Sequence, residues 1–291
     1  MKSSVLKTHP SLNRLCHNPV ALFSALMISL YLALALFSAL GWIATDFQTI
    51  ANDRSYQPPS WEYWFGTDLF GRNVLSRAIH ATQTALLVGL FSTTLATVLG
   101  LFFGSLAGYF GGRTDDLVVW LYTTIDSIPY ILLVSAFAFM LGQGILNLLI
   151  ALGLTSWIQL CRLVRSEFMK HKAQDYVQAA KALGAGSRRQ IFRHILPNVF
   201  HIALIQFSLI FVNAIKIEVI LSYLGLGVEP GTPSWGMMID DAKLELHQGV
   251  WWNLGAATFF MFFLILSVNL LNDSLRDALD PKWHRPTSSK N

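Results

Sequence analysis

The chain has 291 residues, of which 53% are hydrophobic and 13% are charged. An ordinary soluble domain carries about 25% charged residues, so this composition excludes that class and predicts a protein that crosses a membrane several times. The net charge is +4 and the pI is about 9.1. Basic residues that face anionic lipid explain both values and imply no nucleic-acid partner.

Long apolar runs with few or no charges predict an all-α membrane protein with six transmembrane helices, because a bilayer core needs about 20 consecutive apolar residues per helix. Gly142-Gln143-Gly144 is the expected turn that divides the third helix from the fourth. In chain order the runs are 20–44, the stretch between Arg77 and Arg113, the two halves of the stretch between Asp116 and Arg162, about 197–223 and about 254–271.

The positive-inside rule places both termini in the cytoplasm, since 16 of the 21 Lys and Arg residues then lie inside and 4 lie outside. We therefore expect a multi-pass protein of the inner (plasma) membrane. Its expected parts are a cytoplasmic N-terminal tail (1–19), a first transmembrane helix (20–44), a periplasmic loop with a helix that leads into the membrane (45–78), a five-helix core (79–272) with a cytoplasmic loop (162–197) and a periplasmic loop (224–253), and a cytoplasmic C-terminal tail (273–291).

In the first outer loop, Thr67 or Asp68 can cap a helix that carries the apolar residues from Val74 to Ile79 toward the second span. We favour a structural role for this helix, and contact with an extracytoplasmic solute receptor is the alternative. In the third span, Asp126 is a rare intramembrane carboxylate. We expect it to hydrogen-bond between helices rather than to touch a substrate.

The segment from Asp175 to Asn198 is polar, basic and helical in pattern. Asp175 can cap a short helix, with Gln178 reaching back to it, and Gly184 suits the end of that helix because it tolerates positive φ.

Ser187, with Gln190 three residues later, can start a second short helix, and Pro197 fits the first turn of the fifth span. The pattern therefore predicts helix, glycine turn, helix and membrane. Such a compact knob can dock into a groove of another protein, or it can lie on lipid headgroups as an amphipathic helix.

Two charges stand out in the fifth span. Lys216 lies about 26 Å along the helix, where its side chain can reach the outer interface, and a role in a solute pathway is the alternative. Glu218 is two residues away, so the two side chains do not face each other as a simple pair. In the following outer loop, Trp235, Trp251 and Trp252 predict an interfacial aromatic belt.

Some chemistry is missing from the sequence. No G-x-x-x-x-G-K-[ST] phosphate loop occurs, so any nucleotide energy must come from another chain. No grouping of catalytic or metal-binding residues stands out, so we expect neither an enzyme nor a bound cofactor or metal. Cys16 and Cys161 both fall on the expected cytoplasmic side, where no disulfide is expected.

The cytoplasmic segment resembles the EAA motif of ABC importer permeases, in which Glu-Ala-Ala, three further residues and Gly precede a Leu-Pro pair. Its counterparts here are Gln178-Ala179-Ala180, Gly184 and Leu196-Pro197, with Gln in place of the usual Glu. In that family the loop is the coupling element that docks in a cleft of the ATPase subunit.

The resemblance extends over roughly residues 60–283 to the C-type permease subunits of oligopeptide, dipeptide and nickel importers. The motif GTDLFGRNVLSR is similar to the family's GTD-x-x-GRDVLSR, which singles out Gly66, Thr67, Asp68, Gly71 and Arg72, with Asn73 where Asp is usual. Further matching stretches are AGYFGGRTDD, TSWIQLCRLVRSE, LSYLGLGVEPGTPSWG and LRDALDPKW. Asp126 and Glu218 match acidic family positions, whereas Lys216 replaces an aliphatic residue.

This resemblance implies a permease subunit of a binding-protein-dependent ABC importer for peptides that works by alternating access. It implies a heterodimer with a B-type permease, two cytoplasmic ATP-binding subunits that use ATP and Mg, and a solute-binding protein. It also suggests that the outer loop around Trp235 helps to receive substrate. A nickel or other small-solute importer is the alternative within the class. A stand-alone carrier or channel is the alternative outside it, but that would leave the EAA-like loop unexplained.

Overall fold

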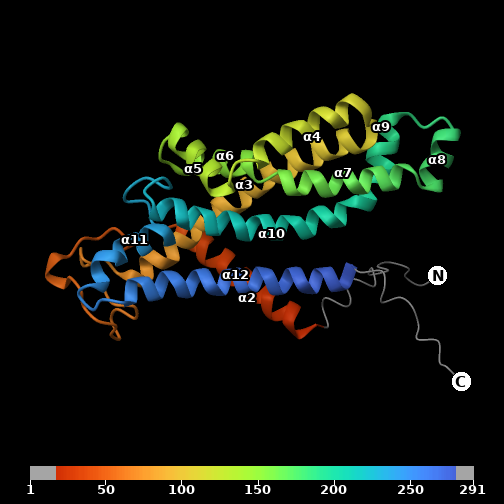
Figure 1. Ribbon diagram of the computed structural model, residues 1–291. Helices are drawn as coiled ribbons and strands as arrows, with labels where there is room; N and C mark the ends of the chain where they lie inside the picture. Colours follow the sequence, from red (N-terminus) through yellow and green to blue (C-terminus); the bar gives the residue numbers. More distant parts are fainter. Residues whose placement is uncertain (1–17, 280–291) are drawn as a thin grey trace, which may run out of the picture.

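The computed structural model describes residues 18–279, and this part of the chain is helical, without strands. The cysteine at position 16 and most of both predicted tails lie outside it. The elements are α2 (Pro19–Ala39), η1 (Asn52–Arg54), α3 (Val74–Phe110), α4 (Gly112–Asp126), α5 (Tyr130–Leu141), α6 (Ile145–Thr155), α7 (Ile158–Lys172), α8 (Asp175–Ala182), α9 (Ser187–Arg189), η2 (Gln190–Ile195), α10 (Leu196–Tyr223), α11 (Trp235–Leu246) and α12 (Trp252–Leu279) (Figure 1).

Five helices in the described part are long and apolar enough to cross a membrane, and the pair α4 and α5 makes a sixth if it is counted as one span. This pair is bent by 88°, which corrects the expectation of a straight third helix. Pro129 explains the break, because it has no N–H to donate and disfavours helical geometry at the preceding residue. Asp126 is therefore the last residue of α4 rather than a residue inside a continuous helix.

The expected turn between the third and fourth spans is confirmed. Gly142 and Gly144 have φ of +84° and +135°, which a glycine adopts without strain. The fourth span then continues through α6 and α7 to Lys172. The first ten or so residues of the cytoplasmic loop expected from residue 162 are thus helical, and Arg162 lies within α7.

α3 and α7 pack closely because α3 presents glycines to α7. A Cβ at Gly104 would lie 2.7 Å from the carbonyl oxygen of Cys161, and one at Gly108 would lie 2.5 Å from that of Arg165. Small residues four apart let two membrane helices approach to backbone contact. The ion pair between Arg165 Nη2 and Asp115 Oδ2, at 2.6 Å, ties α4 to the same helix. α7 is thus held firmly where it leads into the polar segment.

The molecule is elongated, and its polar connections lie at opposite ends (Figure 1). α8 and α9 form one end, whereas α11 and the loop before α3 form the other. α3, α10 and α12 run along the length between them, and α2 packs against α12 and α3. The ends of the molecule match the alternation of inner and outer segments that the sequence predicts.

Candidate functional site

The segment α8 to α9 forms a helical knob around a left-handed glycine. Gly184 has φ of +84°. The N–H of Ala185 donates to Ala180 O at 3.0 Å, and the N–H of Gly184 donates to Lys181 O at 3.0 Å. This pair of bonds is the Schellman arrangement that ends a helix on glycine. The expected helix end at Gly184 is confirmed.

The caps expected at the starts of the two helices are wrong. The N-cap of α8 is Gln174 and that of α9 is Gly186, and neither has a side-chain cap bond. Gln178 does reach back, but its Nε2 donates to Lys172 O at 2.7 Å. Ser187 is the first residue of α9.

The knob is fastened to the membrane helices by a few buried contacts. Val177 on α8 is 1% exposed. The hydroxyl of Tyr109, at the end of α3, donates to Gln190 Oε1 at 3.0 Å, and Lys172 Nζ donates to Tyr109 O at 2.6 Å. Gln190 Nε2 also donates to Ala185 O at 2.6 Å, beside the glycine turn. The knob is therefore fixed to α3 and α7.

Two large apolar side chains in and directly after the knob are uncovered. Leu183 is 89% exposed and Phe192 is 66% exposed, and both belong to the segment that follows α7. Ala179 is also exposed, and Leu196 and Pro197 are the first two residues of α10. Exposed apolar groups on a rigid turn are what a partner surface can cover.

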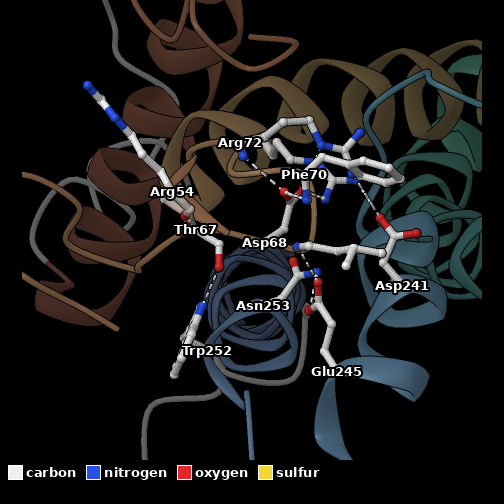
Figure 2. Close-up of polar contacts among 11 residues, drawn as sticks. Arg54, Thr67, Asp68, Phe70, Arg72, Asp241, Glu245, Trp252 and Asn253 are labelled. Carbon is white, nitrogen blue, oxygen red and sulfur yellow. Dashed lines mark hydrogen bonds and ion pairs between the residues drawn. The ribbon is translucent and has the colours of Figure 1, made fainter. Parts of the chain in front are cut away.

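At the other end, the motif Gly66 to Arg77 folds around the carboxylate of Asp68, which is fully buried (Figure 2). Asp68 Oδ1 accepts from the N–H groups of Phe70 and Arg72, each at 2.9 Å. Asp68 Oδ2 accepts from Arg72 Nε at 2.7 Å and from Arg77 Nη1 at 2.6 Å. Two guanidiniums and two backbone donors thus satisfy one buried charge.

Gly66, Thr67 and Gly71 of the same motif hold the loop in a tight turn structure. Gly66 and Gly71 have φ of +64° and +70°. The carbonyl oxygen of Thr67 accepts a hydrogen bond from Trp252 Nε1 at 2.8 Å, and the hydroxyl of Thr67 donates one to Arg54 O (Figure 2). The expectation that Thr67 or Asp68 caps the helix is wrong. Asn73 is the cap, with Oδ1 accepting from Leu75 N at 3.1 Å.

α11 completes this cluster, called the outer cluster after its expected side of the membrane, with acidic residues that the sequence alone did not single out. Asp241 Oδ2 accepts from Arg77 Nη2 at 2.8 Å. Glu245, 1% exposed, accepts from Leu69 N at 3.2 Å and from Asn253 Nδ2 at 2.9 Å (Figure 2). Burial raises the pKa of Glu245, an effect that the nearby charges of Asp68 and Asp241 reinforce and the two hydrogen bonds oppose. The i, i+4 spacing of the two acids on a helix was the available signal.

Trp235 does not belong to an exposed aromatic belt. It is fully buried, and its Nε1 donates to Ala78 O on α3 at 3.1 Å. Trp252 is also buried, whereas Trp251 is 60% exposed. The expectation of an interfacial belt is therefore wrong for Trp235 and Trp252, which fasten α11 to α3 and α12 to the loop before α3.

A cavity of about 480 Å³, lined by both polar and apolar side chains, lies where α4 breaks, where α6 meets α7, and beside α10. Asp126 Oδ2 and Arg162 Nη2 form an ion pair at 2.7 Å on its wall, and both side chains are about half exposed. The hydroxyls of Tyr130 and Ser156 hydrogen-bond at 2.8 Å. The expected interhelical contact of Asp126 is thus present, to an arginine on α7.

The two charges of the fifth span behave differently. Lys216 is exposed and makes no ion pair with any carboxylate of residues 18–279. Glu218 is fully buried, and its Oε1 accepts from Ser222 Oγ at 2.8 Å. The structure therefore does not bring these two residues together.

These observations define a helical, multi-span membrane protein with a polar knob at one end and a buried ionic cluster at the other. A family model described as "Binding-protein-dependent transport system inner membrane component" matches residues 100–285. The chain belongs to this family of ABC importer permeases.

Curated relatives cover nearly the whole chain. The dipeptide transport system permease protein DppC of Bacillus subtilis (strain 168) is 33% identical, over 98% of this chain and 88% of that protein. The di/tripeptide transport system permease protein DppC of Pseudomonas aeruginosa (strain UCBPP-PA14) is 36% identical, over 91% and 89%. The glutathione transport system permease protein GsiD of Shigella dysenteriae serotype 1 (strain Sd197) is 34% identical, over 94% and 90%.

Proposed function

We propose that the chain is the transmembrane subunit of an ATP-driven peptide importer of the inner membrane. Membership of the permease family carries this proposal, and the names of the relatives above, which describe dipeptide, di/tripeptide and glutathione transport, supply the substrate class. The chain itself contains no phosphate loop, so ATP and Mg are used by two partner subunits.

In this proposal the knob of α8 and α9 docks on an ATP-binding subunit at the cytoplasmic side. The exposed Leu183 and the rigid glycine turn support this role. Because α7 leads straight from the cavity wall to the knob, a movement of the docked knob moves the wall. ATP binding and hydrolysis thus drive alternating access.

The second permease subunit covers the side of α4, α7 and α10 that borders the cavity, and it completes the pathway. The half-exposed pair Asp126 and Arg162 supports this placement, since charges within a membrane span face protein or water rather than lipid. At the outer end, α11 and the loop around Asp68 receive a solute-binding protein. The buried ionic cluster keeps this end rigid.

The test is the ATPase activity of the complex purified with its partners. We expect the receptor loaded with a di- or tripeptide to stimulate ATP hydrolysis, and the empty receptor to stimulate it less. Stimulation by a nickel-loaded receptor instead of a peptide-loaded one would contradict the peptide assignment. A chain that purifies without any ATP-binding subunit and still transports solute would contradict the importer.

A further inference from the structure

We propose that the cavity beside α10, together with Lys216, is a binding site for peptides in transit that recognises the C-terminal carboxylate. This inference rests on the proposed function, because it concerns the same pathway. Beyond the substrate class, it names the part of the peptide that is recognised, the C-terminal carboxylate, and the residue that binds it, Lys216.

The anionic group of the cavity wall is already neutralised. Asp126 is bonded to Arg162 at 2.7 Å, and the arginine also lies 4.8 Å from the centre of the Tyr122 ring. This pair contributes no net charge. Any charge selectivity of the site must come from another residue.

We assign this role to Lys216, which is not itself part of the cavity lining. It lies three positions beyond Asn213, which lines the cavity, so the two side chains are neighbours on one face of α10. Both are exposed, as is Ile220 on the next turn. Because an ammonium group that faces lipid within a span is costly, we place the Lys216 side chain on the solute pathway rather than at the lipid interface. Within residues 18–279 no carboxylate pairs with it, and the face therefore carries a net positive charge.

The remaining polar groups suit a peptide backbone. The side chains of Gln159 and Asn213 are exposed on the cavity and form no hydrogen bond with residues 18–279. A primary amide both donates and accepts, as a peptide group does. Such contacts do not depend on the peptide's side chains. A site with two free amides and one free cation therefore fits the end of a peptide that carries a carboxylate.

The experiment compares ATP-driven uptake of trialanine with that of its C-terminal amide, in proteoliposomes that contain the whole complex and saturating receptor. The measured quantity is the ratio of the two uptake rates. Because the receptor is the same throughout, its own preference cancels when variants are compared. We expect Lys216→Gln to lower the ratio of acid to amide by about fivefold, and Lys216→Arg to retain it.

Lys170→Gln is the matched control, because Lys170 is also an exposed cation but is paired with Glu167 on α7. It should leave the ratio unchanged. An unchanged ratio in Lys216→Gln would overturn the proposal. Loss of the second permease subunit from purified Lys216→Gln, with equal loss of acid and amide uptake, would also overturn it and assign the lysine to a carboxylate of that subunit. Absence of any ATP-driven peptide uptake by the wild-type complex would instead contradict the proposed function.

Discussion

Gly71 lies where the first outer loop crosses its own chain. Its φ is +70°, and a Cβ there would lie 1.9 Å from the carbonyl oxygen of Ala51. Gly41 has the same φ, but a Cβ added there would meet no atom within 4 Å. Substitutions at the two glycines therefore impose the same backbone strain, but only a substitution at Gly71 also causes steric overlap.

We predict that Gly71→Ala destabilises the protein more than Gly41→Ala. Gly41→Ala should cost about 1 kcal/mol of strain, whereas Gly71→Ala should cost about 1 to 3 kcal/mol in addition, because the loop must move. Thermal unfolding of the purified variants in detergent measures the difference. Equal melting temperatures would show that the loop is not packed as described.

Glu245 provides a pH-dependent test of the outer cluster. Its pKa is raised above the ordinary value of 4.5, mainly by burial. The folded state therefore holds the proton more tightly than the unfolded state, and stability falls as the pH rises from about 4.5 through the raised pKa. Glu245→Gln removes this pH-dependent loss of stability, because a glutamine side chain does not ionise. Asn253 can rotate its amide to pair with the new group, since its Oδ1 has no partner among the described residues.

We predict that the melting temperature of Glu245→Gln gains on that of the wild type as the pH is raised above 4.5, and that the two run parallel below it. Glu62→Gln, at a side chain that is 73% exposed, is the control for loss of a surface carboxylate. A constant difference between Glu245→Gln and the wild type at all pH values would contradict the assignment of a raised pKa.

The outer cluster shows which residue-level features a sequence can predict. The short motif around Asp68 could be singled out, because its residues are adjacent in the chain. Its partners Asp241 and Glu245 lie more than 160 positions away, and no local pattern connects them. The N-cap of α3 was predicted at the wrong residue for a related reason. Thr67 and Asp68 are equally good capping types, but their side chains are used by the loop, which leaves Asn73 for the helix.

At the scale of elements, the knob of α8 and α9 is the part whose proposed role depends most on its geometry. Gly184 has φ of +84°, and an added Cβ would meet no atom within 4 Å. A larger side chain there costs strain of about 1 kcal/mol but no packing. Its effect on function must then arise from the angle between the two helices and from the partner's surface.

We predict that Gly184→Val inserts and remains folded but loses ATPase association and uptake. Gly249→Val is the matched control, since Gly249 has φ of +79° and equally open surroundings beyond α11, at the other end of the molecule. Gln178→Glu should be tolerated, because Gln178 is exposed and water can replace its bond to Lys172. The measurement is the amount of ATP-binding subunit that co-purifies with each variant at matched expression. Full retention of that subunit by Gly184→Val would mean that the knob only lies on lipid.

Most element boundaries follow from local chemistry, and the two exceptions each have an identifiable physical cause. The turn at Gly142 and the helix end at Gly184 were predictable from glycine alone. The break at Pro129 was visible in the sequence, but hydropathy continues across it, so length suggested one helix. The extension of α7 to Lys172 is polar and is stabilised by packing on the glycine face of α3, which no pattern within α7 shows.

For the whole molecule, the arrangement of its ends predicts the topology. The loop with Trp61 and the helix that starts at Trp235 lie at one end, and Ser187 lies at the other (Figure 1). The charge distribution places the second of these ends in the cytoplasm. Reporter fusions after Trp61 and Trp235 should therefore read outside, and a fusion after Ser187 should read inside. An outside reading at Ser187 would remove the coupling role of the knob.

The central claim is that this chain forms a peptide pathway driven by ATP hydrolysed in other subunits. ATP-driven accumulation of a labelled dipeptide in proteoliposomes tests it most directly, with the full complex compared to one that lacks this chain and to one that lacks the ATP-binding subunits. We predict accumulation that requires all components, the solute-binding protein and hydrolysable ATP. Accumulation by this chain alone, or by the complex without ATP, would contradict the claim and favour a stand-alone carrier.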